Sequence, residues 1–473
     1  MLKILHVSAE CSPFVKIGGL ADVVGSLPQE IKRLRNAEVR VMIPFYKSIP
    51  KTFRSKAKDL TNFKIDFDNE SVYVGVKTLK KGNILYYFID NEFFFGSRDK
   101  VYNYGDESKR FAYFQLAVLE SIKHLDFTPE IIHVHDWHTA MIPYLVKNKY
   151  PDLKTKTVLS IHNLAYQGIF PLKDYQLFNL DYNHVFEFDG NLNFLKSGIV
   201  SADLLTTVSP NYAQEILTDY YGYGMQKLLK QRGGDLIGIL NGIDYTEFSP
   251  STDKVIAKNF GIEDFKEGKR ANKEALFKEL KVNFDLDIPV ISLISRLVSQ
   301  KGIDLIQRVM GEILDNDKLS LIILGSGEEV YESFFKDLEE NYPDKVKVYI
   351  GYSDKLAHMI YAGSDMFLMP SKFEPCGLGQ IISLKYGTIP IVRETGGLVD
   401  TIQPYNEFEK EGNGFSFTNF NAHDMMHVVR YAIQIYENDL STWERIIFNA
   451  MNSDYSWQKS ARIYRDIYKD ILR

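Results

Sequence analysis

The chain has 473 residues, with 56 Lys and Arg against 62 Asp and Glu, so its formal net charge is −6. Apolar residues make up 45% and charged residues 25%, a globular balance that excludes disordered, collagen-like and coiled-coil proteins. The length predicts two or three domains. The mildly acidic charge argues against nucleic acid as a partner. The two cysteines, Cys11 and Cys376, exclude a disulfide scaffold and a multi-thiolate zinc site.

The sequence contains no segment that is expected to target or anchor it to a membrane. No apolar run approaches the roughly 18 residues that a spanning helix needs, so we expect no membrane partner. The N-terminus resembles neither a secretory signal nor a Ser/Arg-rich transit peptide. These features predict a cytoplasmic protein, and a plastid form whose transit peptide had been removed would have the same features. The oligomeric state is left open.

Short β-rich runs alternate with helical patterns along the whole chain. Most are near-continuous Val/Ile/Leu runs, typical of strands covered on both faces, and alternating β and α segments of this kind predict parallel sheets with right-handed crossovers. Helical spacing is clear in Leu20–Leu34, Gly302–Leu314 and Glu328–Leu338. The predicted strands are Lys3–Ser8, Glu38–Ile43, Ile131–His135, Thr157–Ile161, Leu204–Val208 and Ile237–Leu240, followed by Val290–Ile294, Ser320–Leu324, Lys345–Ile350, Met366–Met369, Ile389–Val392 and Gly414–Phe417.

Two series of six strands predict two doubly wound, Rossmann-like domains of the α/β class rather than one very large sheet. The polar stretch Asp244–Asp264 is the expected hinge, which gives domains at residues 1–243 and 244–455. Ligands of such folds bind beyond the carboxyl ends of the strands, so we expect a deep cleft between the two domains. Residues 456–473 have the spacing of an amphipathic helix, and the pattern alone does not say which domain it packs against.

The first candidate site follows the first strand, at Lys16-Ile-Gly18-Gly19. Paired glycines at a helix start allow backbone N–H groups to approach an anion, and Lys16 adds a positive charge that suits a phosphorylated substrate. A tight turn with an exposed lysine explains the same pattern equally well.

The second candidate site is formed by polar residues at the ends of two predicted strands. His133 and His135 lie on one face of their strand, which allows a metal site, although a buried structural pair is the commoner case. Asp136 is placed to hold a substrate hydroxyl. His162 and Asn163 follow the next strand and are expected to reach the same region.

The third and fourth candidates lie in the second half of the chain. Arg296 and Lys301 follow a buried strand and are expected to stabilise a diphosphate without a metal, unless they are only solvated surface cations. Glu374 lies in Glu374-Pro-Cys-Gly377, where we expect a carboxylate beside free N–H groups of a helix start.

Three further features have both a binding and a structural interpretation. Gly396-Gly397 is a second loop where backbone can approach a ligand, and Tyr352 offers a flat face that suits a base or a core. The aromatic-rich segments at residues 93–104 and 182–194 suit stacking on a glucan, and they suit a core equally well.

Together these motifs resemble the bacterial glycogen synthase and plant starch synthase family. The resemblance runs in order from residue 4 to about residue 468 and includes Ser456-Trp457. The matching segments are Ser8–Glu10, Lys16–Asp22, His135–His138, Ser160–Asn163, Thr207–Pro210, Leu240–Asp244, Ser295–Leu297 with Gln300–Gly302, Glu374–Leu378 and Thr395–Asp400.

The resemblance implies a retaining glycosyltransferase of the GT-B type that moves glucose from ADP-glucose to the non-reducing end of an α-1,4-glucan without a metal or other cofactor. It implies donor contacts on the second domain, acceptor contacts on the first, and a C-terminal helix that crosses back to the first. The residues it places in catalysis are Glu374, Asp136, His162, Arg296 and Lys301. Those it places near the substrates are Lys16, Gly18, Gly19, Asp22, Glu10, Asn163, Asn241, Tyr352, Cys376, Gly377, Leu378, Gly396 and Gly397.

The chain departs from many retaining relatives at one position. These carry a second glutamate eight residues after the first, where this chain has Ile382, so a double displacement by two carboxylates lacks its second partner. The alternatives are a transferase that uses UDP-glucose or another acceptor, and a non-catalytic glucan-binding scaffold. The scaffold would be expected to have lost the cations or Glu374, and a phosphorylase would need a pyridoxal lysine, for which no motif is found.

Overall fold

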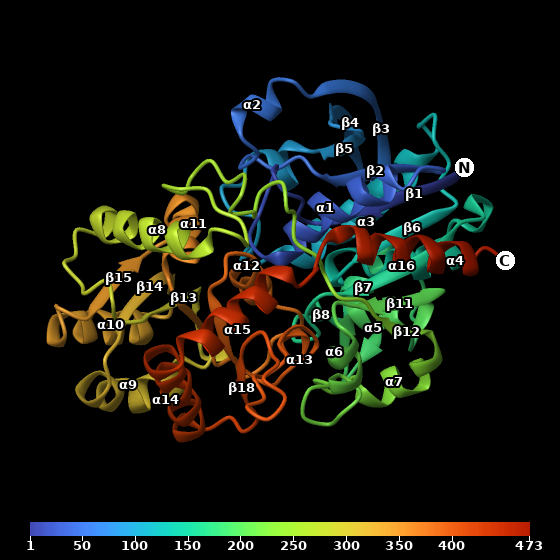
Figure 1. Cartoon of the computed structure of the whole chain (residues 1–473). Coiled ribbons are helices and arrows are strands. Elements are labelled where there is room, and N and C mark those ends of the chain that lie inside the picture. Colours follow the sequence, from blue (N-terminus) through green and yellow to red (C-terminus); the bar gives the residue numbers. More distant parts are fainter. The chain divides into compact units, whose positions relative to one another are not determined.

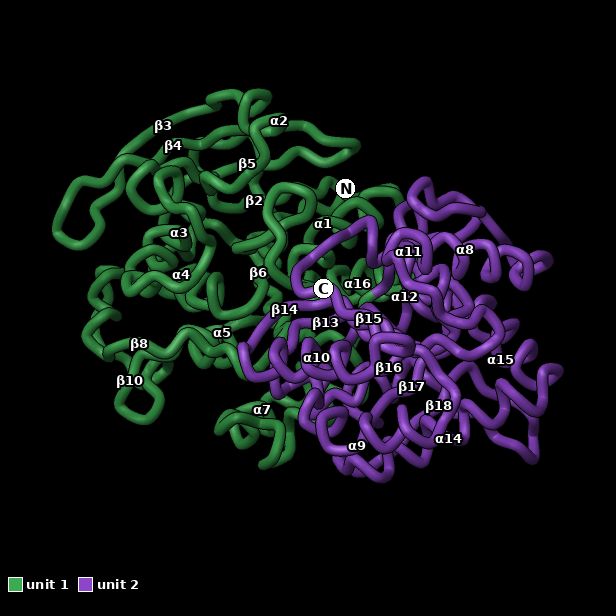
Figure 2. Tube along the Cα trace, turned by 90° about the vertical axis from the view of Figure 1, so that its left-hand side faces the viewer, with its two compact units in different colours: residues 1–241, 457–473 green, residues 242–456 purple.

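The computed structural model describes all residues from 1 to 473 and divides the chain into two compact units. Unit 1 comprises Met1–Asn241 together with Trp457–Arg473, and unit 2 comprises Gly242–Ser456 (Figure 2). These boundaries lie within two residues of the expected ones. No helix is long and apolar enough to cross a membrane.

Unit 1 is built on one sheet of nine strands, ordered β12-β11-β7-β6-β1-β2-β5-β4-β3. The strands from β12 to β5 are parallel, and those at the centre are buried on both faces because apolar residues occupy consecutive positions. The bounds are β1 Leu2–Val7, β2 Ala37–Pro44, β3 Lys58–Phe67, β4 Glu70–Lys81, β5 Ile84–Asp90, β6 Ile131–His135, β7 Lys156–Ile161, β11 Leu204–Thr207 and β12 Leu236–Gly238.

The expectation of purely parallel sheets is wrong for one edge of unit 1. Strands β3 and β4 form an antiparallel hairpin, and β4 also pairs antiparallel with β5. The hairpin turns at Asp68 and Asn69, which both have positive φ, the backbone of a tight turn between twisted strands. Its outer strand is largely exposed, so it lacks the apolar run by which most of the parallel strands are recognised. The neighbouring β5 was not predicted either, although it is largely buried and pairs parallel with β2. A small separate sheet is formed by β8 Ile169–Pro171, β9 Glu187–Phe188 and β10 Asn191–Asn193.

The last helix of the chain, α16 (Trp457–Asp470), belongs to unit 1 and packs beside α1 (Gly19–Arg33) (Figure 1). The Ser460 hydroxyl donates to the Leu240 carbonyl at 2.5 Å, and Tyr468 is fully buried. The implied return of the C-terminal helix to the first domain is therefore present. The other helices of unit 1 are α2 Lys51–Arg54, α3 Glu107–Ile122, α4 Ile142–Asn148, α5 Phe194–Ser201, α6 Pro210–Glu215 and α7 Gln226–Gln231.

Unit 2 contains a parallel sheet of six strands, ordered β15-β14-β13-β16-β17-β18. Aliphatic side chains of its strands and helices form one continuous core. The strands are β13 Val290–Leu297, β14 Ser320–Gly327, β15 Val346–Ile350, β16 Met366–Met369, β17 Ile389–Arg393 and β18 Phe415–Phe417. The helices are α8 Phe265–Leu280, α9 Ile303–Asn316, α10 Glu329–Asn341, α11 Asp354–Gly363, α12 Gly379–Lys385, α13 Gly397–Thr401, α14 Ala422–Asn438 and α15 Leu440–Asn452.

A buried lysine on α8 makes the stability of unit 2 depend on pH. The Lys269 ammonium donates to the carbonyls of Ala362 and Tyr386 and, at 2.8 Å, to the Thr388 hydroxyl. No carboxylate neutralises it directly, and burial lowers the pKa of Lys269 to about 7. Between pH 7 and about 10.5 the unfolded chain therefore binds one more proton at this site than the folded chain. The free energy of unfolding should rise with pH by up to about 1.4 kcal/mol per unit because of this lysine.

Comparison with K269M tests this expectation, since the methionine keeps the side-chain length and cannot titrate. The free energy of unfolding of unit 2 is measured in urea at pH 7, 8 and 9 through Trp443 fluorescence, with Trp137 and Trp457 replaced by Phe in both proteins. We expect the difference, wild type minus K269M, to increase with pH. A difference that stays constant over this range would contradict the role given to Lys269.

Candidate active site

The residues expected to act in catalysis lie at or just beyond the carboxyl ends of parallel strands. In unit 1, Glu10 follows β1, Asp136 follows β6 and His162 follows β7. In unit 2, Arg296 is near the end of β13 and Glu374 follows β16. The carboxyl ends of parallel strands form one edge of a sheet, so within each unit these residues gather at the edge where α/β proteins bind ligands.

In unit 1, a buried carboxylate shapes the glycine loop that leads into α1. One oxygen of Glu10 accepts from the backbone N–H of Ile17 at 2.6 Å and of Gly18 at 3.0 Å, and the other accepts from the Tyr102 hydroxyl at 2.6 Å. Burial raises the pKa of Glu10. The arrangement indicates that Glu10 holds the loop, while Lys16 and Gly18 remain at the surface.

The same loop borders a pocket in unit 1. The Lys16 ammonium forms a 2.7 Å ion pair with Asp22 on the first turn of α1. Beside it lies a cavity of about 410 Å³, lined by residues 13–17, Ser48, Pro50 and residues 99–103. Lysine, tyrosine and asparagine side chains on its wall offer hydrogen-bond partners for a polar ligand.

Asp136 has an unusual backbone and an unusual electrostatic environment. Its φ is 55° and its ψ is −174°, a combination that is almost confined to glycine and that costs any other residue free energy, and such strain often marks a functional site. One carboxylate oxygen accepts from the backbone N–H of His162 at 2.7 Å, so the ends of β6 and β7 are tied together. The side chain is 8% exposed and burial raises the pKa of Asp136 to about 7.

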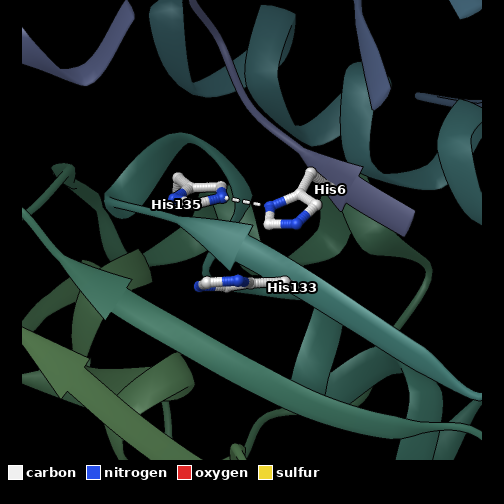
Figure 3. Close-up of side chains that lie close together, drawn as sticks. All are labelled: His6, His133 and His135. Carbon is white, nitrogen blue, oxygen red and sulfur yellow. Dashed lines mark hydrogen bonds between the residues drawn. The ribbon is translucent and has the colours of Figure 1, made fainter. Parts of the chain in front are cut away.

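The two histidines of β6 belong to a larger buried cluster that includes His6 of β1 (Figure 3). Sequence reasoning left a metal site or a structural pair open for His133 and His135, and it did not include His6. The ring nitrogens of His133 are within 2.6 Å of the Tyr468 hydroxyl and 2.7 Å of the Ser160 hydroxyl. His6 Nδ1 and His135 Nε2 are 3.1 Å apart. Because these nitrogens already have hydrogen-bond partners, the structural interpretation is favoured.

Three other residues expected near the substrates, Asn163, Asn241 and Tyr352, differ in their burial. The Asn163 side chain accepts from the N–H of Ala165 at 3.1 Å, within its own loop. Asn241 is buried at the end of unit 1, and its side-chain oxygen has no hydrogen-bond partner. Tyr352 in unit 2 is 72% exposed, so the core interpretation is wrong for this ring.

In unit 2, an ion pair joins the third and fourth motifs. The Lys301 ammonium is 2.5 Å from a Glu374 carboxylate oxygen, and the Ser371 hydroxyl donates to the same oxygen at 3.1 Å. The backbone N–H of Lys372 donates to the Gln300 carbonyl at 2.9 Å, which ties the two loops together. Glu374 is 7% exposed whereas Arg296 is exposed. A buried carboxylate, its lysine and an arginine therefore share one sheet edge.

Glycines allow the loops around Glu374 to pack backbone against backbone. A Cβ on Gly396 would lie 2.0 Å from the Glu374 carbonyl oxygen, and one on Gly397 would lie 2.2 Å from that of Cys376. The Gly397 N–H donates to the Glu374 carbonyl at 3.1 Å. These contacts indicate that Gly396 and Gly397 support the loop that carries Glu374.

The helix expected to start at the fourth motif begins later. Gly377 has φ of +73° and Leu378 precedes α12, whose first residue is Gly379. Pro375 therefore lies in the loop before the helix, where it is buried together with Cys376. We expected the free N–H groups of the helix start directly beside Glu374. They lie further along the chain, because the turn at Gly377 separates Glu374 from the start of α12.

The aromatic segments contain both stacking and core residues. Phe93 is 64% exposed, whereas Phe94 and Phe95 are buried. Tyr182 is 54% exposed, whereas Phe186 is fully buried. Each segment therefore combines an exposed aromatic ring, which is available for stacking, with aromatic residues that belong to the core.

Sequence reasoning missed Tyr102, Ser371 and His6, which contact predicted residues directly. Tyr102 lies within an aromatic segment that was considered only for stacking. His6 lies in the buried part of β1. A histidine within an otherwise apolar strand that is covered on both faces is a signal that could have identified it.

Two Rossmann-like units, with a carboxylate and cations at the carboxyl ends of their strands, define a glycosyltransferase of the GT-B class. A family model described as the starch synthase catalytic domain matches residues 3–231, and one described as glycosyl transferases group 1 matches residues 276–450. The chain belongs to the glycogen synthase and starch synthase family, which confirms the resemblance seen in the sequence.

Relatives and solved structures agree with this assignment. A glycogen synthase of Bacillus cereus is 48% identical over 482 residues and one of Anoxybacillus flavithermus is 48% identical over 480, each matched over all of this chain and 100% and 98% of its own length. The catalytic domain of starch synthase IV from Arabidopsis thaliana, bound to ADP and acarbose, has a TM-score of 0.92 and 32% identity over the full length of both chains. A sucrose-phosphate synthase of Thermosynechococcus elongatus, 14% identical with a TM-score of 0.61 over 100% of this chain and 99% of its own, shares the fold.

Proposed function

We propose that the protein transfers glucose from ADP-glucose to the non-reducing end of an α-1,4-glucan, with retention of configuration at the anomeric carbon and without a metal ion. The observation that carries this proposal is the buried Glu374–Lys301 ion pair at the end of β16 and β13, with Arg296 on the same sheet edge. The lysine paired with the carboxylate and the arginine on the same sheet edge provide charge for a diphosphate, and the carboxylate is a partner for a sugar hydroxyl. The ADP bound to the starch synthase IV domain supports the choice of donor.

Unit 2 is proposed to bind the donor. Arg296 and Lys301 would hold the diphosphate, and the negative charge that develops as the sugar leaves would be stabilised by both cations. Glu374 would accept a hydrogen bond from the glucose, and its ion pair with Lys301 fixes both side chains before the substrate arrives. The exposed Tyr352 ring is proposed to lie near the donor.

Unit 1 is proposed to bind the acceptor and to contact the transferred glucose. Asp136 and His162 would contact that glucose, since the hydrogen bond between them fixes their relative position. Lys16 with Gly18 and Gly19 would lie near the diphosphate and glucose of the donor. The pocket beside Lys16 has polar groups and an aromatic wall, which suits a sugar ring, and Phe93 and Tyr182 are candidates for stacking on a longer glucan.

Retention is proposed to result from attack on the same face of the sugar that the diphosphate leaves. The bond between the anomeric carbon and the diphosphate oxygen breaks as the acceptor hydroxyl forms the new glycosidic bond, and the acceptor proton passes to the leaving phosphate. Position 382 is isoleucine, so no second carboxylate is available there for a covalent intermediate.

The experiment is ADP release from ADP-glucose with glycogen, compared with UDP-glucose and repeated with a chelator. We expect release that requires glycogen, prefers ADP-glucose and is unaffected by the chelator. Preference for UDP-glucose, or release without glycogen, would contradict the proposed substrates. Loss of activity with the chelator would contradict metal independence, and a β-linked product would contradict retention.

A further inference from the structure

Three histidines form a continuous row from the buried first strand to the surface of unit 1. His6 Nδ1 is 3.1 Å from His135 Nε2, and His135 Nδ1 is 3.0 Å from His162 Nε2. His6 and His135 are 0% exposed, whereas His162 is partly exposed. His135 uses both of its ring nitrogens in these hydrogen bonds. The nitrogen that carries the proton in His6 therefore determines which nitrogen carries it in His135 and in His162.

The number of protons in the row follows from its burial. Burial lowers the pKa of His6 and of His162 to about 3 and that of His135 well below its usual value, so at neutral pH each ring carries one N–H. Two hydrogen bonds between three neutral rings allow only two arrangements. Either every N–H is directed toward His6, or every N–H is directed toward His162.

The buried end of the row decides between the two arrangements. His6 Nε2 is buried without a hydrogen-bond partner. If the N–H groups were directed toward His6, this nitrogen would carry a buried and unsatisfied N–H, which proteins avoid more strictly than an unsatisfied acceptor. At the other end, His162 Nδ1 has no partner in the chain, so solvent or substrate can satisfy it in either arrangement. The row therefore favours Nδ1–H on His6, Nδ1–H on His135 and Nδ1–H on His162.

We propose that His6 and His135 are positioning residues that hold His162 in the Nδ1–H tautomer, so that its ring presents a hydrogen-bond donor to the sugar. The contact of the His162 N–H with the sugar rests on the function proposed above, whereas the assignment of the tautomer does not. His133 is not part of the row, because both of its ring nitrogens form hydrogen bonds with the hydroxyls of Tyr468 and Ser160.

A metal ion on His6, His133 and His135 is the competing interpretation, because one nitrogen of each lies within 4.8 Å of the others. The existing contacts disfavour it. A metal would displace the hydroxyl partners of His133 or the hydrogen bond between His6 and His135. The cluster also has no carboxylate that would offset the ion's charge.

The first test reads the tautomer directly. Long-range ¹H–¹⁵N spectra of protein labelled with ¹⁵N-histidine distinguish Nδ1–H from Nε2–H, and the His162 signals are assigned by their loss in H162N. We expect Nδ1–H on His162 in the wild type. In H6F, which removes the link to His135, and in H135F, which removes both links, we expect a mixture with Nε2–H. Nε2–H in the wild type, or an unchanged tautomer in both variants, would overturn the proposal.

The second test separates positioning from stability. In H6F we expect kcat to fall about 10-fold with KM nearly unchanged, and H6N should recover most of kcat because its amide reaches the position of Nδ1. Y468F is the matched control, since it removes the buried hydroxyl next to His133 outside the row, and it should leave both kcat and the His162 tautomer unchanged. Equal losses of kcat in H6F, H6N and Y468F would overturn the proposal in favour of a structural role.

The outcomes also distinguish this proposal from the proposed function. If the protein does not transfer glucose but His162 carries Nδ1–H in a row-dependent way, the function fails and the tautomer assignment stands. If transfer occurs and the tautomer is independent of His6, the function stands and the row is overturned. Binding of one equivalent of zinc that H6F abolishes would overturn the row in favour of a metal site.

Discussion

E374Q is expected to lower kcat by about 1000-fold, the upper end of the loss seen when one stabilising group is removed from a transition state. The substitution keeps the shape of the side chain and its hydrogen bond from Ser371 but removes the charge opposite Lys301. The lysine then faces a neutral amide oxygen in place of the carboxylate 2.5 Å away, and the amide N–H₂ at the other position cannot accept from a sugar hydroxyl. Both the sugar contact and the placement of the diphosphate cation are therefore impaired. The measurement is single-turnover transfer from ADP-glucose to glycogen at saturating substrate.

A second Glu–Lys ion pair of unit 2 provides the matched control for E374Q. Glu339 and Lys347 are 2.6 Å apart on α10 and β15, and both are more exposed than the Glu374–Lys301 pair. An exposed pair of this kind contributes at most about 1 kcal/mol to stability, so E339Q should keep full activity. Circular dichroism of both variants establishes that they are folded. Near-normal turnover by folded E374Q would remove Glu374 from the chemistry.

D136N should lower kcat by about 100-fold while leaving the protein equally or more stable. Asparagine retains the oxygen that accepts from the His162 N–H but cannot carry a negative charge. That charge would stabilise the transferred glucose, because the transition state of the sugar is positively charged. Burial raises the pKa of Asp136 to about 7. In the wild type kcat should therefore rise as the pH increases through about 7, whereas in D136N this rise should be absent.

The sign of the stability effect follows from the same raised pKa of Asp136. Between about pH 4 and 7 the folded state holds a proton that the unfolded state has lost. This residue therefore makes the free energy of unfolding of the wild type fall as the pH rises through that range, by up to about 1.4 kcal/mol per unit. D136N removes this decrease. Urea unfolding at pH 5 and pH 8 should show a variant that gains relative stability at the higher pH.

Asp203 provides the matched control for D136N. Its carboxylate accepts from the Thr157 N–H at 2.8 Å at the start of β7, whereas Asp136 accepts from His162 just after the end of the same strand. D203N should therefore lower stability and leave kcat unchanged. Equal loss of kcat in D136N and D203N would mean that the effect of Asp136 is structural.

The sequence predicts most of the parallel strands because they read as runs of β-branched and aliphatic residues. It missed β5, a largely buried run that pairs parallel with β2. The hairpin β3–β4 was not predicted, since its exposed strand mixes lysine, aspartate and threonine with apolar residues. The turn at Asp68-Asn69 was a usable signal, because a two-residue turn with Asp or Asn at both positions between alternating segments is typical of a hairpin.

Site residues could be predicted where a short motif follows a single strand, but the contacts between different motifs could not. Glu374 and Lys301 were both identified, yet their ion pair joins residues 73 positions apart, and nothing in local spacing predicts which cation a carboxylate meets. The contact of His133 with Tyr468 spans 335 positions. Such contacts depend on the order of strands in the sheet and on the path of α16, and neither is encoded in a short window of sequence.

The position of α16 in unit 1 has a consequence for synthesis of the protein on the ribosome. The residues of unit 1 up to Asn241 emerge first, but Trp457, Tyr464 and Tyr468, which are buried in unit 1, emerge last. At about 5–20 residues per second, the nascent unit 1 waits for the whole of unit 2 before its apolar surface is covered. A premature stop codon anywhere in unit 2 would therefore damage unit 1 as well, although the first 241 residues would be intact.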